Sequence, residues 1–324
     1  MKIAKKLICF ALALLLIGAV SNRGHCGLFR KTPKKVLVKS EQLYEEGKYN
    51  EAVIELEKII SKQYSSKIQK KAYWYLGKCY ESLSDFDKAV NTYQLAAQLY
   101  SKDIPLHLAL AGIYYKVGLL DEARSQYKEI LEMDKNNFQA NVGLAQTYER
   151  LGFLRFASDH YKIALQSKSQ KSTKLKRDYA RCFLKQRRCV EAEDAAQKAL
   201  RDFKSDPDSQ LLLAQVRNAC GKKKMALADI SKAIDLAPLR TDIAIHKALW
   251  LISDGDLKSA FQLLWPMLKR EPGNPLVAWT ASLAFLKSGK IKQAGKYLGI
   301  TAANTQSPFI AEVSGKMIEE IKGK

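Results

Sequence analysis

The chain has 324 residues and a net charge of +21, with 54 Lys and Arg against 33 Asp and Glu. Its six cysteines include no Cys-x-x-Cys pair and its four histidines are scattered, which argues against a metal or thiol-redox centre. Neither a glycine-rich phosphate loop nor a Gly-x-Ser-x-Gly elbow occurs. We therefore expect no catalytic residue, cofactor or metal, and a protein that is not an enzyme.

Residues 1–21 have the pattern of an export signal. A basic stretch, Met1-Lys-Ile-Ala-Lys-Lys6, precedes an uncharged run from Leu7 to Val20. Fourteen helical residues span about 21 Å, which is short of a ~30 Å hydrocarbon core. Ala19-Val-Ser21 offers small residues in the spacing that a signal peptidase accepts. We expect a cleaved signal followed by a basic linker over 22–32; an uncleaved membrane anchor and lipidation at Cys26 are the alternatives.

From residue 33 to residue 307 the chain repeats itself. Eight marker alanines follow one another at intervals of 34 or 35 residues after a first interval of 37. They are Ala52, Ala89, Ala123, Ala157, Ala192, Ala226, Ala260 and Ala294. This period is typical of a helix–turn–helix unit repeated in tandem, so we predict an all-α chain.

The residues around each marker explain the period. A glycine stands five residues before six of the markers, where positive φ costs it little and a tight turn between two helices can form. These are Gly47, Gly118, Gly152, Gly221, Gly255 and Gly289, and Arg187 takes this place in the fifth unit. In the seventh unit Pro266 lies inside the expected second helix and should kink or shorten it.

The second unit carries the clearest motif. It reads Ala72-Tyr-Trp-Tyr-Leu-Gly-Lys-Cys-Tyr80, then Asp85-Phe-Asp-Lys-Ala89, followed by Tyr93 and Ala96. This resembles the tetratricopeptide repeat (TPR) family, and the resemblance covers eight units. It implies a right-handed α-solenoid of tandem helix–turn–helix repeats over 33–307. It also implies a non-enzymatic scaffold for protein–protein interaction.

A C-terminal capping helix is expected over 308–324. Phe309, Val313, Met317 and Ile321 stand four residues apart and would form one apolar face toward the last repeat. Glu312, Lys316, Glu319 and Glu320 would face water, as expected of the terminal element of a solenoid.

The family resemblance implies that the first helix of each unit lines a concave groove. Carrying its groove positions over gives a basic groove in the middle of the array, suited to an acidic peptide or carboxylate. We define the basic groove by Tyr115, Lys116, Arg150, Arg177, Arg181 and Lys185. Tyr44, Trp74 and Lys78 are further groove-lining residues.

The last two units give an apolar groove instead. We define it by Ile245, Leu249, Ile252, Trp279, Leu283 and Leu286. An exposed apolar stripe of this size would mark a partner site. The alternative is that the capping helix folds back and fills it.

The cysteines of the repeats have two interpretations. Cys79 and Cys182 fall ten residues before their markers, where a thiol acts as a small hydrophobe. Cys189 could approach Cys182 across the turn of the fifth unit, and the sequence leaves this pairing open. Unpaired thiols are unusual in the oxidising compartment that an export signal implies.

The function we expect is the binding of an extended or helical segment of a partner protein in the concave groove. We expect an exported setting, periplasmic or secreted, with membrane tethering as the alternative. A competing hypothesis is a peripheral or tethered membrane protein whose basic surface binds anionic lipid or cell-wall polymer. A nucleic-acid-associated protein is less favoured, because the aromatic residues are mostly committed to repeat packing.

Overall fold

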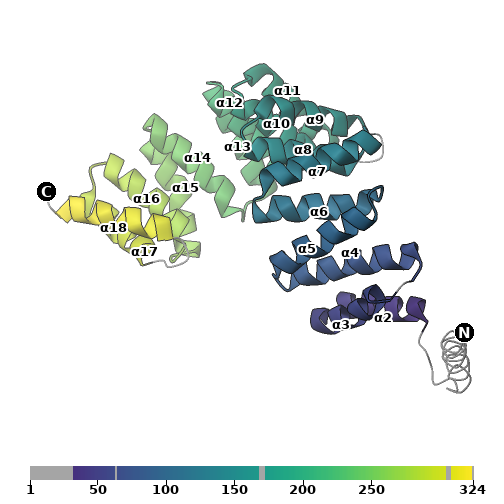
Figure 1. Cartoon of the computed structure of the whole chain (residues 1–324). Coiled ribbons are helices and arrows are strands. Elements are labelled where there is room, and N and C mark those ends of the chain that lie inside the picture. Colours follow the sequence, from purple (N-terminus) through teal and green to yellow (C-terminus); the bar gives the residue numbers. More distant parts are fainter. Residues whose placement is uncertain (1–31, 63, 168–171, 304–307, 323–324) are drawn as a thin grey trace, which may run out of the picture. The chain divides into compact units, whose positions relative to one another are not determined.

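The computed structural model describes residues 32–62, 64–167, 172–303 and 308–322 (Figure 1). The expected export signal, Cys26 and all but the last residue of the linker lie outside the described residues. Within the described part the chain forms seventeen α-helices and no strand, which confirms the all-α prediction. The chain divides into two compact units, of which unit 1 ends at Leu119 and unit 2 begins at Leu120.

Unit 1 contains five helices, each packed against the next. They are α2 (Pro33–Glu45), α3 (Tyr49–Ile60), α4 (Ser66–Ser82), α5 (Phe86–Leu99) and α6 (Ile104–Val117). In addition, α2 packs on α4 and α4 on α6, so the first helices of successive repeats form one layer.

Unit 2 continues the pattern with twelve helices. The first six are α7 (Leu120–Met133), α8 (Phe138–Arg150), α9 (Leu154–Gln166), α10 (Thr173–Lys185), α11 (Cys189–Asp202) and α12 (Pro207–Ala219). The last six are α13 (Lys223–Leu236), α14 (Thr241–Asp254), α15 (Leu257–Arg270), α16 (Pro275–Lys287), α17 (Ile291–Ala302) and α18 (Pro308–Lys322). Helices α10 and α12, and α14 and α16, pack side by side as first helices of adjacent repeats.

The marker alanines belong to the apolar cores of the repeats; Ala192 shares a cluster with Ala180 of its facing helix, and Ala260 shares one with Ala248. All eight are fully buried. Glycine permits a close approach at two further places, between the paired helices α4 and α5 and between α7 and α8 of successive repeats. A Cβ on Gly77 would lie 2.3 Å from the ring of Tyr93, and one on Gly143 would lie 2.2 Å from the ring of Tyr127. The 34-residue period therefore reports a small residue that recurs in the buried core of each repeat.

The turn inside each pair has the same backbone conformation in every repeat. The six glycines expected there all have positive φ. Ser84 and Arg187 occupy the corresponding positions in the two repeats without that glycine, and they also have positive φ, of 60° and 58°. The packing of the two helices thus imposes a left-handed residue even where the side chain disfavours it.

The expectation of a shortened helix at Pro266 is wrong. Helix α15 continues through Pro266 to Arg270 and has 14 residues, as α13 and α14 do. The neighbouring Leu264, Met267 and Leu268 are buried, and this tertiary packing holds the last turn despite the missing N–H donor.

Helix α18 caps unit 2 by packing against α17. Its buried face centres on Ser314, which is fully buried and accepts a 2.6 Å hydrogen bond from the hydroxyl of Thr301. Val313, Met317 and Ile321 are half-buried, but Phe309 is 76% exposed, so its expected place on the apolar face is wrong. Phe309 precedes Ser314 by five residues, which turns it about 140° away from the packed face.

Candidate functional site

The groove-facing side of unit 1 centres on Glu81 at the end of α4. Lys78 Nζ lies 2.9 Å from Glu81 Oε1, and the hydroxyl of Tyr93 donates to the same oxygen at 3.0 Å. Lys116 Nζ, from the next repeat, lies 3.9 Å from Glu81 Oε2. Burial raises the pKa of Tyr93, which keeps this phenol a proton donor. Lys116 of the basic groove therefore already has a carboxylate partner.

Aromatic side chains occupy the rest of this face. Trp74 contacts the ring of Tyr75 with 5.0 Å between centroids, and Tyr75 in turn contacts Tyr44 at 5.7 Å. The ammonium of Lys78 lies over the Trp74 ring at 5.7 Å. A hollow of about 470 Å³ opens beside Trp74. Tyr115 lies half-buried on α6. The predicted groove-lining residues Tyr44, Trp74 and Lys78 thus lie close together.

The basic groove is divided between the units, since Tyr115 and Lys116 lie on α6 and the other four residues on α8 and α10. In unit 2, Lys185 Nζ lies 2.6 Å from Glu149 Oε1, and Tyr161 donates to Glu149 Oε2 at 2.9 Å. Arg181 pairs with Asp178 at 2.9 Å, and burial raises the pKa of Asp178. Arg150 is exposed at the end of α8.

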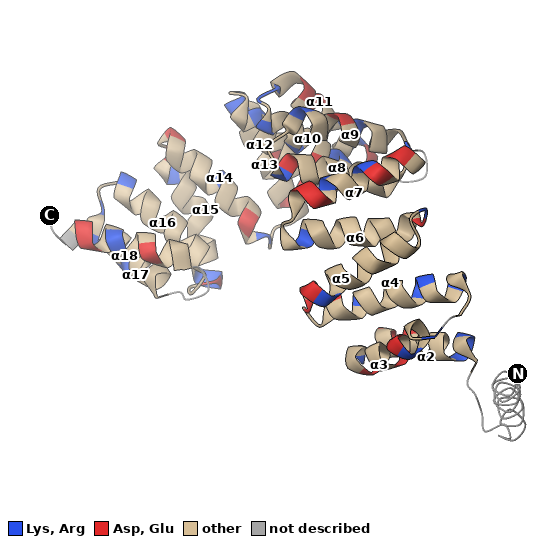
Figure 2. Ribbon diagram, in the orientation of Figure 1, with Lys and Arg blue, Asp and Glu red and all other residues tan. Residues whose placement is uncertain are grey.

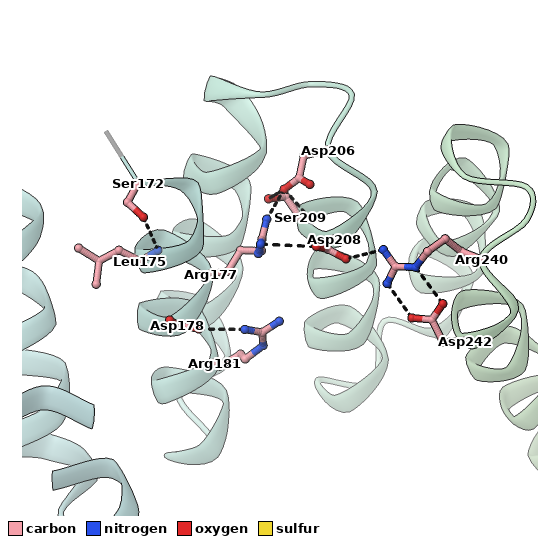
Figure 3. Close-up of polar contacts among 10 residues, drawn as sticks. All are labelled: Ser172, Leu175, Arg177, Asp178, Arg181, Asp206, Asp208, Ser209, Arg240 and Asp242. Carbon is pink, nitrogen blue, oxygen red and sulfur yellow. Dashed lines mark hydrogen bonds and ion pairs between the residues drawn. The ribbon is translucent and has the colours of Figure 1, made fainter. Parts of the chain in front are cut away.

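Arg177 lies at the start of a chain of ion pairs that crosses three repeats (Figure 3). Its guanidinium pairs with Asp206 and lies 3.5 Å from Asp208. Asp208 also accepts from Arg240 at 2.9 Å, and Arg240 pairs with Asp242 at 2.6 Å. Asp206 is in place because it caps α12, accepting from the backbone N–H of that helix. Figure 2 marks Lys and Arg in blue and Asp and Glu in red on the ribbon; each of these ion pairs joins a cation to a carboxylate of the same unit.

The apolar groove lies on α14 and α16, which pack directly on each other. Ile252 is buried, whereas Ile245, Leu249, Trp279, Leu283 and Leu286 are half-buried. At its end, Lys287 Nζ donates to the carbonyls of Ile252 and Ser253 at 2.5 and 2.8 Å, satisfying the last carbonyls of α14. Because α18 packs chiefly against α17, the two apolar helices keep a partly exposed face.

Sequence reasoning missed two features of these repeats. One is the pairing of a buried tyrosine with a groove glutamate twelve residues earlier, seen in Tyr93–Glu81 and Tyr161–Glu149. That recurrent spacing was a signal in the sequence. The other is a disulfide between Cys189 and Cys220, two residues in the turns of adjacent repeats.

The open pairing of Cys182 with Cys189 is thereby excluded. Cys182 and Cys79 are unpaired and buried, as expected of small hydrophobes. Burial raises the pKa of both thiols to about 11.

The described residues contain no group of three or more His, Cys, Asp or Glu side chains arranged to hold a metal ion. None of the helices in that part of the chain has the length and apolar content needed to cross a bilayer.

Comparison with known proteins agrees with this geometry. Residues 39–104 and 108–172 match the family model described as tetratricopeptide repeat. No curated protein matches the chain in sequence. The fold is an all-α solenoid of tandem helix–turn–helix repeats of the tetratricopeptide type with a C-terminal capping helix.

Solved structures share this fold at low sequence identity. A tetratricopeptide repeat protein from Parabacteroides merdae is 14% identical, with a TM-score of 0.59 over 90% of this chain and 98% of that one. Yeast Tom70 is 16% identical, with a TM-score of 0.57 over 90% of this chain and 64% of that one. PilW, a type IV pilus biogenesis factor, is 16% identical, with a TM-score of 0.56 over 64% of this chain and 96% of that one. Such repeats are generally non-catalytic, and the fold supports a scaffold role in protein–protein interaction.

Proposed function

We propose that the protein is a scaffold that binds an extended or helical segment of a partner protein in the apolar groove of α14 and α16. The observation that carries this proposal is a row of apolar side chains on two adjacent first helices. Trp279 and Leu283 stand one turn apart on α16 and are half-buried, so a docking side chain could remove their remaining area from water. Burying apolar area contributes roughly 25 cal/mol per Å².

The absence of charged side chains from the apolar groove indicates the chemistry of the partner. The six residues that define the apolar groove include no charged side chain, and Lys287 beside it already binds backbone carbonyls. A suitable segment therefore presents apolar side chains one helical turn apart, or on one face of an extended strand. Its binding should resist salt, because screening weakens charge–charge contacts between exposed groups and leaves apolar contacts in place.

The alternative proposal is that an acidic segment of a partner protein binds in the basic groove. It is less favoured, because Lys116, Arg177, Arg181 and Lys185 each have a carboxylate partner within their own unit. An incoming carboxylate would have to displace an existing ion pair, and exchange of one surface ion pair for another yields little free energy.

We also propose that the protein works outside the cytoplasm, as a periplasmic or secreted protein. The basic and apolar pattern of residues 1–21 supports this setting. The Cys189–Cys220 disulfide gives independent support, because disulfides persist in oxidising compartments. Sequencing of the mature N-terminus tests the export signal, and a soluble cytoplasmic pool that begins at Met1 would contradict it.

Cross-linking in the native cell, followed by affinity capture and high-salt washing, tests the groove. The wild type is compared with Leu249→Asp in the groove and with Leu236→Asp as a matched control at the end of α13, where the side chain is exposed. Circular dichroism establishes that both variants keep their helices. We expect one discrete protein with the wild type and the control, and its loss with Leu249→Asp. If Leu249→Asp captures the same protein as the wild type, the proposal that the apolar groove binds the partner is refuted.

A further inference from the structure

The turns inside the helix pairs of unit 2 lie along one edge of the molecule. Gln186, after α10, donates to the carbonyl of Leu154 at the start of α9 with a 3.0 Å hydrogen bond. The disulfide from Cys189 to Cys220 then joins the α10–α11 turn to the α12–α13 turn. Three successive turns are thereby adjacent.

The same edge continues through the next two repeats. Lys223, at the start of α13, forms an ion pair with Asp254 at the end of α14. Lys287, at the end of α16, donates to the carbonyl of Ser253 at 2.8 Å. We call this row of five turns the turn edge, and define it by residues 152–156, 187–191, 221–225, 255–259 and 289–293.

The turn edge is strongly basic, more so than three loops at the opposite ends of the same helices. Its five segments carry nine Lys and Arg against two acids, Glu191 and Asp256. Three of the loops that join successive pairs at the opposite ends of the helices, residues 202–208, 235–242 and 269–276, carry four Lys and Arg against six Asp and Glu. Positive charge is thus denser along the turn edge than in these three loops.

Most of these cations lack a partner. Five of them are exposed and have no acidic partner among the described residues. They are Arg155, Arg187, Lys224, Lys290 and Lys292, whereas Lys258 interacts electrostatically with Asp256. This differs from the basic groove, where carboxylates from the same unit accompany the cations.

Large apolar side chains stand exposed among the cations. Phe156 is 56% exposed and Val190 is 81% exposed. Phe153, Met225 and Ile291 are exposed by 47%, 46% and 49%. Cations interspersed with exposed apolar side chains are the composition of surfaces that lie in a membrane interface.

We propose that the turn edge binds the surface of an anionic membrane. The cations would contact lipid phosphates while the apolar side chains enter the interface between headgroups and acyl chains. Membrane is favoured over nucleic acid because Phe153 and Phe156 in one turn are the only aromatic side chains of the turn edge, whereas the exposed Val190, Met225 and Ile291 in three other turns offer no stacking surface to a base. This inference concerns a surface separate from the apolar groove and goes beyond the proposed function.

Vesicle flotation tests the charge contribution. The full chain is compared with Arg187→Glu/Lys224→Glu/Lys290→Glu on the turn edge and with a control that carries the same charge change elsewhere. The control is Lys135→Glu/Lys204→Glu/Lys269→Glu; Lys135 and Lys204 lie in loops between successive pairs, and Lys269 lies in the last turn of α15. On phosphatidylglycerol vesicles we expect the partition coefficient of the turn-edge variant to fall at least about 100-fold, and that of the control much less. Equal effects of the two variants, or equal binding to phosphatidylcholine vesicles, would overturn the proposal.

A local probe distinguishes the turn edge from any other attachment. Phe156→Trp places a tryptophan on the turn edge, and Phe203→Trp places one between α11 and α12 at a side chain that is almost equally exposed, 55% against 56%. Brominated lipids should quench the added fluorescence at position 156 and not at position 203. Equal quenching, or none at position 156, contradicts the proposal. So does binding to duplex DNA without binding to vesicles, which would reassign the surface to a polyanion.

Discussion

The close approach of α4 and α5 at Gly77 leads to the sharpest prediction about stability. A Cβ built on Gly77 lies 2.3 Å from two ring atoms of Tyr93. Tyr93 is fully buried, so its ring cannot swing into solvent. Gly77→Ala therefore forces the helices apart or the ring out of place, and it disturbs the hydrogen bond from Tyr93 to Glu81.

Two opposing effects decide whether Gly77→Ala raises or lowers the free energy of unfolding. Replacing glycine by alanine inside a helix stabilises it by roughly 0.5–1 kcal/mol. Overpacking a buried contact costs typically 1–3 kcal/mol, and occasionally more. The contact at 2.3 Å is far below van der Waals separation, so we expect the steric cost to win and Gly77→Ala to lose about 1–2 kcal/mol net.

Gly112 supplies the matched control in the next first helix of the same unit. A Cβ there meets no atom within 4 Å, so the substitution changes only the helix propensity of the residue. Gly112→Ala should therefore raise the free energy of unfolding by up to about 1 kcal/mol. Urea unfolding followed by circular dichroism measures both variants. The double variant Gly77→Ala/Tyr93→Leu should recover part of the loss, because the ring is gone. If Gly77→Ala and Gly112→Ala stabilise equally, the packing argument is refuted.

Three further predictions concern the turns and the disulfide. Arg187→Gly should raise the free energy of unfolding in urea by about 0.5–1 kcal/mol, because a side chain at positive φ costs about 1–2 kcal/mol and glycine avoids that cost. A lower free energy of unfolding would show that contacts of the Arg187 side chain outweigh this backbone cost. Reduction of the Cys189–Cys220 disulfide, which spans 31 residues, should cost about 3–4 kcal/mol in the same assay, and an unchanged midpoint would contradict it. Hydrogen bonds from Lys222 and Arg217 lower the pKa of Glu193 below its ordinary value of 4.5. The resulting stabilisation is present above that value and lost as pH falls through the folded-state pKa, so the advantage of wild type over Glu193→Gln should shrink on acidification; a constant advantage would contradict it.

The architecture could be predicted because its causes are local and repeat along the chain. The marker alanines are fully buried in all eight repeats, and the six turn glycines have positive φ, as their spacing predicts. The turns at Ser84 and Arg187 show that the repeat imposes this conformation even without glycine. Phe309 was misplaced because residues four apart drift around a helix by about 40° at each step.

The contacts of the candidate site were harder to predict, because they join residues of different repeats. Lys116–Glu81 and Lys185–Glu149 connect residues 35 and 36 positions apart, one repeat plus a short step. The groove positions include Glu81 and Glu149 as well as the two lysines, but the sequence pattern does not show that they pair across repeats. The lysines of the basic groove are therefore less available to a ligand than their positions alone indicate. The disulfide also joins adjacent repeats. It was not predicted, because the only pairing considered, Cys182 with Cys189, lies within one repeat.

Site-specific photo-cross-linking tests the central claim, that the apolar face of α14 and α16 binds a partner protein. A photoreactive residue replaces Leu283 in the groove or, as the control, Leu236 at the end of α13, and the cells are irradiated before lysis. The account predicts one discrete cross-linked protein at position 283, absent at position 236 and abolished when Leu249→Asp is added. Equal cross-linking at both positions, or a product at position 283 that survives Leu249→Asp, would contradict it.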